Sequence, residues 1–150
     1  MTGLQIRQFM FESGFLFSAN PRCIVDDEDY SHPSEMWMLT TWRDAVDANN
    51  RALGLSESIP ESNDCDDFAD RAVRWAKDSH ARMRRPGRGF AVGTFTYSPD
   101  VAGGKSHKSV FAIVADREGK PKLLLFEPQS PCRPIQLSER EKATCEKFSV

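Results

Sequence analysis

The sequence predicts an α+β fold, in which helices from the first half of the chain pack on one side of a small antiparallel sheet from the second half. Apolar residues recur every three or four positions in the segments 34–53 and 64–84, as they do in amphipathic helices. Aromatic and β-branched residues then concentrate in the segments 90–97, 107–115 and 121–127, which is typical of strands. The change of period near residue 90 therefore divides the chain into a helical and a strand-forming half.

The length and composition favour a single domain, residues 1–150. A net charge of -2 with 28% charged residues indicates a mixed surface, so we expect neither a nucleic-acid nor a membrane partner. No apolar run approaches the roughly 20 residues of a membrane span, and Arg7, Gln8 and Glu12 interrupt the Phe-rich start, unlike a signal peptide. The four cysteines include no C-x-x-C pair, which indicates reduced thiols and predicts a cytoplasmic protein. The sequence predicts no oligomeric state.

The N-terminal half is predicted to contain a short helix, a loop and a longer helix. Residues 2–17 suggest a short helix followed by an extended piece, and the prolines and acidic run of 19–35 suggest a surface loop. The next helix ends before Gly54, and 54–63 is a polar linker. Its apolar residues, which we expect to share one stripe, are Met36, Leu39, Trp42, Val46 and Leu53.

A second long helix is predicted from about residue 64 to 84. Its stripe consists of Phe68, Ala72, Trp75 or Ala76, Ser79 and Met83, and Cys65 lies one turn before Phe68 on the same stripe. We therefore expect Cys65 to point inward or to the rim of a groove. The strands 107–115 and 121–127 are joined by the turn "DREGK", and the spacing of Ser138 and Glu141 predicts a capping box before a short final helix.

Cys65 is a candidate nucleophile because it stands at the predicted start of a helix. A thiol attacks as its thiolate, which the unpaired N–H groups and the dipole of a first helical turn stabilise. Asp64, Asp66 and Asp67 oppose this effect unless they point away or are neutralised by a cation. The alternative is a structural thiol in the core, since free cysteine is among the most buried residue types.

His107 is the candidate partner of Cys65. It lies where a glycine-containing turn leads into an apolar strand, so rigid structure would hold its ring. His80 lies 15 positions after Cys65 in the same predicted helix, over about 20 Å away at 1.5 Å per residue. His32 lies beside Pro33 in the acidic loop, which makes it the weaker choice.

Glu127 and Gln129 are predicted to flank His107. Counting back from the hairpin turn, residue 115 pairs near 120 and residue 107 near 128, so Glu127 and Gln129 fall on either side of the histidine. A carboxylate there would fix the tautomer of the ring and favour its charged form.

The motifs "DCDDFA", "SHKSVFAIV" and "LLLFEPQ", in this order, resemble the papain-like cysteine peptidase domain of the Marasmius oreades agglutinin, a mushroom lectin, and its microbial and phage-borne relatives. The resemblance covers about residues 60–130, which it implies to be the catalytic core. Residues 1–55 would form a helical lobe, for which no motif is matched. The resemblance thus implies a papain-like fold.

The resemblance also implies roles for the candidate residues. Cys65 would be the nucleophile, His107 the general base and acid, and Glu127 the orienting carboxylate, with Gln129 beside them. Because the agglutinin peptidase depends on calcium, a calcium site near these groups is implied, with Asp66 and Asp67 as the candidate ligands. The agglutinin has a sugar-binding domain before its peptidase, for which 150 residues leave no room.

The sequence therefore predicts a thiol hydrolase, a cysteine peptidase or amidase with a Cys-His-Glu catalytic triad, which acts on a protein or peptide substrate. The alternative from another class is a non-enzymatic binding or inhibitor module on the same fold, which could be encoded by a phage. A structural domain with a buried Cys65 is the third hypothesis.

Overall fold

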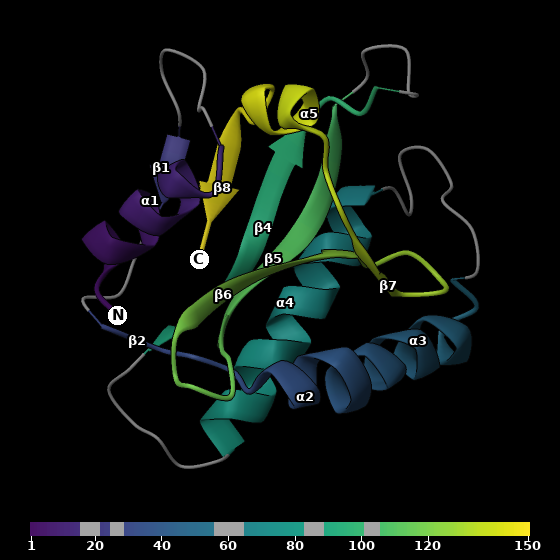
Figure 1. Cartoon of the computed structure of the whole chain (residues 1–150). Coiled ribbons are helices and arrows are strands. Elements are labelled where there is room, and N and C mark those ends of the chain that lie inside the picture. The colour runs from purple at the N-terminus through teal and green to yellow at the C-terminus, as the bar shows by residue number, and fades with distance from the viewer. Residues whose placement is uncertain (16–21, 25–28, 56–64, 83–88, 101–105) are drawn as a thin grey trace.

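The computed structural model describes residues 1–15, 22–24, 29–55, 65–82, 89–100 and 106–150, with the backbone alone at 22–24. Its centre is a six-stranded sheet with the strand order β1-β8-β4-β5-β6-β7 (Figure 1). β1 and β8 are parallel and the other neighbouring strands are antiparallel. The strands of this sheet are β1 (Arg22–Ile24), β4 (Val92–Tyr97), β5 (His107–Ala115), β6 (Pro121–Glu127), β7 (Arg133–Ile135) and β8 (Lys147–Ser149).

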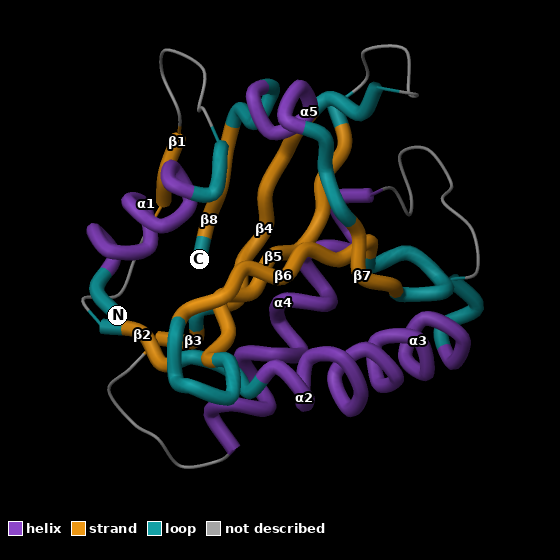
Figure 2. Tube along the Cα trace, viewed as in Figure 1, coloured by secondary structure: helices purple, strands orange, loops and turns teal. Residues whose placement is uncertain are grey.

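The helices pack around this sheet, and a small parallel pair of strands lies at one end of it (Figure 2). The pair consists of β2 (Tyr30–Ser31) and β3 (Gly89–Phe90). The helices are α1 (Gly3–Glu12), α2 (Glu35–Trp37), the π-helical turn η1 (Met38–Trp42), α3 (Arg43–Ala52), α4 (Cys65–Arg82) and α5 (Glu139–Ala143). The predicted α+β class, the long helix α4 and the hairpin of β5 and β6 are confirmed.

Both faces of β5 are apolar, so the sheet is covered on both sides. Phe111 and Ile113 belong to a core cluster with the α1 residues Ile6 and Met10. Val110, Ala112 and Val114 point to the other face and belong to a second cluster with residues of η1, α3 and α4. The expectation that all helices of the N-terminal half lie on one side is therefore wrong. α1 covers the opposite face, because a strand that is apolar on both sides needs cover on both.

The buried stripe of η1 and α3 differs from the predicted one. Its members recur in steps of four, and they are Met38, Trp42, Val46 and Asn50. Met36 and Leu53, which were predicted on the stripe, are 66% and 62% exposed. A π-helical turn contains an extra residue, so η1 rotates the face that the following helix presents to the core. Simple helical spacing could not predict this shift.

The short strands were not predicted. The described part of the segment 19–35 is not a surface loop, because it contains the strands β1 and β2 and its Tyr30 and Pro33 side chains are buried. β7 and β8 were not predicted either, although β8 lies between β1 and β4 inside the sheet. Strands of two or three residues carry too little alternation to be recognised by pattern, and these strands pair with partners far away in sequence.

The predicted capping box of α5 is present, and it makes the stability of the helix depend on pH. Ser138 accepts a hydrogen bond from the Glu141 amide, and the Glu141 carboxylate accepts one from the Ser138 amide. That backbone bond is the main reason why the pKa of Glu141 lies below its ordinary value of 4.5. The depressed pKa means that the carboxylate stabilises the fold above pH 4.5 and that this contribution is lost as the pH falls through the folded-state pKa. We expect the thermal midpoints of wild type and Glu141→Gln to differ at pH 7 and to converge as the pH falls below the folded-state pKa, as measured by circular dichroism. A constant difference would contradict this account.

Candidate functional site

Cys65 is the first residue of α4, as predicted, and it lies against the start of β5. Its Sγ accepts a hydrogen bond from the backbone N–H of Lys108 at 3.4 Å. The thiol also lies 3.7 Å from Asp66 Oδ1. Cys65 is partly exposed, so it is not the core thiol of the structural hypothesis. The start of α4 and the start of β5 thus place the Cys65 thiol against Lys108, the residue that follows His107.

His107 and Glu127 form a direct pair. Their side chains are joined by a hydrogen bond of 2.6 Å between Nε2 and Oε2 and are 21% and 15% exposed. A carboxylate only accepts hydrogen bonds, so with Glu127 ionised the ring proton is on Nε2. In a neutral ring with this tautomer, Nδ1 is the acceptor nitrogen. The pair is rigidly supported, since one member begins β5 and the other ends β6.

The hairpin register explains why these two residues meet. β5 pairs with β6 through Ala115 and Pro121 at one end and through Val110 and Phe126 at the other. The predicted pairing of 115 near 120 is one residue short of the observed one. The prediction that Glu127 reaches His107 is confirmed by the hydrogen bond. Gln129 takes part through its backbone, whose N–H donates to Glu127 Oε1 at 3.2 Å.

The other two histidines lie elsewhere in the fold, as expected. His80 Nε2 is 3.2 Å from Ser31 Oγ, and its ring stacks on Phe90. His32 Nδ1 lies 3.0 Å from the carbonyl oxygen of Ile113.

Two further residues support the site, and the sequence analysis missed both. Lys108 pairs with Asp70 of α4 at 2.8 Å, which ties the start of β5 to the helix that carries the thiol. Tyr97 lies opposite His107 in the ladder of β4 and β5, and its ring meets the imidazole edge-on at 5.7 Å between centroids. Burial raises the pKa of Tyr97 to about 12, so it stays protonated at neutral pH. Treating 90–97 and 107–115 as neighbouring antiparallel strands and pairing their residues could have placed Tyr97 beside His107.

Asp66 and Asp67 do not form a calcium site by themselves. Both are exposed and consecutive in α4, so their side chains project about 100° apart around the helix axis. Calcium takes about six to eight oxygen ligands. Within the described ranges, no three His, Cys, Asp or Glu side chains gather as they would around a metal ion. Among these residues Asp66 and Asp67 therefore do not complete a calcium site, and calcium binding stays a prediction.

The environments of the cysteines predict a selective reaction with iodoacetamide. Burial raises the pKa of Cys132 to about 12 and that of Cys145 to about 11, so both remain thiols at pH 8. Cys65 is partly exposed at a helix start. Because the thiolate is the reactive form, we expect Cys65 to be alkylated well before Cys132 and Cys145 in the folded protein. Peptide mass spectrometry over time measures the three rates, and equal rates would contradict the described environments.

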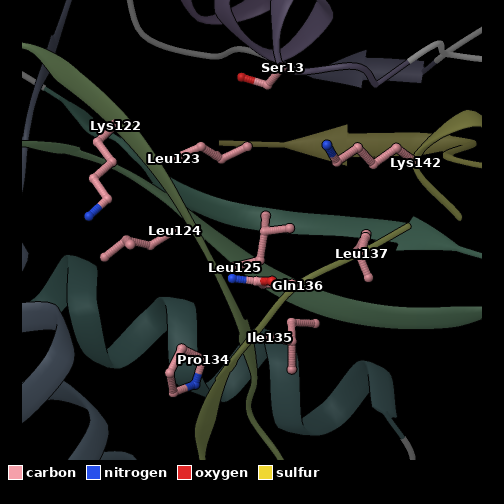
Figure 3. Close-up of a pocket in the computed structure, with 10 residues that line it drawn as sticks. All are labelled: Ser13, Lys122, Leu123, Leu124, Leu125, Pro134, Ile135, Gln136, Leu137 and Lys142. Carbon is pink, nitrogen blue, oxygen red and sulfur yellow. The ribbon is translucent and has the colours of Figure 1, made fainter. Parts of the chain in front are cut away.

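A separate groove of about 710 Å³ lies on the sheet near β6 and β7 (Figure 3). Leu123, Leu125, Ile135 and Leu137 supply aliphatic side chains to it, and Lys122 and Lys142 lie on either side of these in the view. Cys65, His107 and Glu127 do not line it. The candidate site at the start of α4 is thus distinct from this groove.

Comparison with solved structures finds the same fold in chains of a fungal lectin. The first, described as the "PSL1a-E64 complex", superposes with a TM-score of 0.64 at 16% identity and covers all of this chain and 51% of that one. The second is Polyporus squamosus lectin bound to the human-type influenza-binding epitope Neu5Aca2-6Galb1-4GlcNAc, with a TM-score of 0.62, 16% identity and coverage of 100% and 49%. The chain shares its fold with about half of this lectin. No family model and no curated protein matches the sequence.

These comparisons contradict the predicted thiol hydrolase. One of these two structures is described as a lectin and neither description names a peptidase, so the hydrolase function and the catalytic triad are not retained. The second structure is described with a bound sugar epitope, and neither description names a peptide. The prediction failed because one fold serves many functions, so motifs that indicate a fold do not fix the chemistry.

None of the described helices has the length and apolarity that crossing a membrane requires.

Proposed function

We propose that this chain is a non-enzymatic binding module and that its ligand lies at the cluster of Cys65, His107 and Glu127. The observation that supports it most is the pairing of a partly exposed His107 with Glu127 beside the exposed start of α4, in a fold that is also found in a ligand-bound lectin. Exposed polar groups that are already held by strands lose little entropy when they bind. The cluster is therefore suited to recognise a ligand.

The chemistry of the cluster favours a small polar ligand. Glu127 offers carboxylate acceptors, His107 a ring nitrogen, and Cys65 a weak donor and acceptor. Hydroxyl and amide groups of a sugar or a sugar-like compound can bond to all three. The fungal lectin is described with such a sugar, but this chain spans only about half of that chain, so binding of the same sugar here is part of the proposal.

Isothermal titration calorimetry tests the proposal with two separate probes, the trisaccharide Neu5Aca2-6Galb1-4GlcNAc and the E64 compound. We expect saturable binding of at least one probe. Replacing His107 by alanine removes a hydrogen bond to the ligand, and Glu127→Gln removes a charged acceptor. Each loss should weaken binding by about tenfold or more, which corresponds to about 1.4 kcal/mol. Ser106→Ala, an exposed neighbour of His107, is the matched control and should bind as wild type does.

Two outcomes would overturn the proposal. The first is that neither probe binds, or that His107→Ala and Glu127→Gln bind as tightly as Ser106→Ala does. The second is steady cleavage of a peptide by the wild type that is lost in Cys65→Ala, because a binding module does not turn over its ligand. Peptide cleavage is measured by mass spectrometry on the same protein samples.

A further inference from the structure

The helix α3 makes two polar contacts with the segment that follows Glu127. Asn50 donates a hydrogen bond from Nδ2 to the carbonyl oxygen of Pro128 at 3.1 Å. Asp47, one turn earlier, accepts a hydrogen bond from the backbone N–H of Cys132 at 2.7 Å. One face of α3 thus holds both ends of the segment 128–132. Figure 1 shows α3 along the side of the molecule where β6 runs into β7.

These contacts are built into the interior. Asn50 is 3% exposed, and it occupies a position on the buried stripe where an apolar residue would be expected. A buried amide in a helix is costly unless it is hydrogen-bonded, so a specific partner explains its presence there. Cys132 is also 3% exposed. The two contacts therefore lie in a closely packed region, where a displacement of one residue also moves its neighbours.

The segment held by α3 begins at the residue next to Glu127. Pro128, which accepts from Asn50, is directly bonded to Glu127, and the Gln129 N–H donates to Glu127 Oε1. Glu127 ends β6 and pairs with Arg133 of β7, so the ladder fixes both ends of the segment 128–132 but not the residues within it. Its Oε2 must nevertheless stay 2.6 Å from His107 Nε2. The contacts from α3 hold the residues of this segment that the ladder leaves unpaired.

We propose that Asn50 and Asp47 are positioning residues of the candidate site, which fix the segment 128–132 so that the Glu127 carboxylate stays on His107. The expected effect on ligand binding rests on the proposed function, whereas the positioning of the Glu127 carboxylate does not. The ligand would meet His107 and Glu127, and α3 would set the geometry of that pair without touching the ligand.

Proton NMR of the free protein tests the positioning directly. The proton in the short His107 to Glu127 hydrogen bond should give a downfield signal, which is assigned by its loss in His107→Ala. We expect Asp47→Ala and Asn50→Ala to shift, broaden or abolish this signal. Asp47→Asn should restore it, because the amide oxygen can still accept from Cys132. Asn49→Ala, the exposed neighbour on the same helix, is the matched control and should leave the signal unchanged.

Asp47 keeps the test decisive even where Asn50→Ala fails to fold, because Asp47 is only partly buried. An unchanged signal in folded Asp47→Ala, or a signal that Asp47→Asn fails to restore, would overturn the inference. Probe affinity is measured separately, and it should fall by about tenfold in Asp47→Ala, as it does when outer supporting residues are removed from other sites. A wild type that binds neither probe would sink the proposed function and leave the NMR result on positioning intact.

Discussion

Replacement of Trp42 by alanine is expected to lower the free energy of unfolding by about 3 to 5 kcal/mol. The Trp42 ring is fully buried and packs edge-on against Phe126 at 5.0 Å between centroids. Its Nε1 also donates to the carbonyl oxygen of Ala72 at 3.2 Å, so one side chain joins η1, α4 and β6. Removing it leaves a cavity that rigid neighbours cannot fill.

Urea unfolding followed by tryptophan fluorescence and circular dichroism measures this change. Met36→Ala is the control, because Met36 lies on the same helical segment and is 66% exposed. Surface substitutions of this kind change stability by about 0.5 kcal/mol or less. Equal effects of the two substitutions would show that the second core cluster is not packed as described.

Gly93→Ala is expected to have the second largest effect, a loss of about 3 kcal/mol as in other overpacked sites. A Cβ atom on Gly93 would overlap the backbone carbonyl oxygen of Ser149 and press on the Phe111 ring. A backbone carbonyl in a strand ladder cannot rotate away, so β8 would have to separate from β4. Gly93 is therefore required by the close approach of the two strands.

Hydrogen exchange resolves where the effect of Gly93→Ala arises. The amides of β8 should exchange faster in the variant, whereas those of β5 and β6 should keep most of their relative protection. Thr96→Ala, on the same strand and paired with Lys147 of β8, is the control and should cost less than about 1 kcal/mol. Unchanged protection of β8 in Gly93→Ala would contradict the described contact.

Local patterns were sufficient to predict the elements that carry the site. The long stripe of α4 placed Cys65 at a helix start, and a single hairpin with a short turn placed Glu127 beside His107. Both inferences use residues that are close in sequence or separated by a countable register. The capping box of α5 was predicted for the same reason, because its two members are three residues apart.

The features that sequence reasoning missed depend on distant partners. Asn50 meets Pro128 across 78 positions, and nothing in either neighbourhood indicates the other. β8 pairs with β4 although their paired residues lie 51 to 55 positions apart in sequence. The π-helical turn changes the exposed face of α3 without leaving a mark in the apolar spacing. These features are set by tertiary packing, which single-sequence patterns do not report.

The function was the other error, and its cause is different. Glu127 bonds to His107 as predicted, and the Cys65 thiol contacts the neighbouring Lys108 amide, but the order of three motifs indicates a fold and leaves the activity open. Because the fold is shared with a fungal lectin, we propose binding in place of hydrolysis. Whether the cluster receives a ligand is thus the central question about this protein.

NMR of the protein labelled with ¹⁵N in its three histidines tests this claim most directly, because His107 lies in the cluster while His32 and His80 lie elsewhere. The trisaccharide and the E64 compound are titrated separately. A ligand at the proposed site should move the His107 ring signals in a saturable way and leave those of His32 and His80 in place. Unmoved His107 signals at concentrations where calorimetry detects binding would contradict the account, because the ligand would then lie elsewhere on the chain.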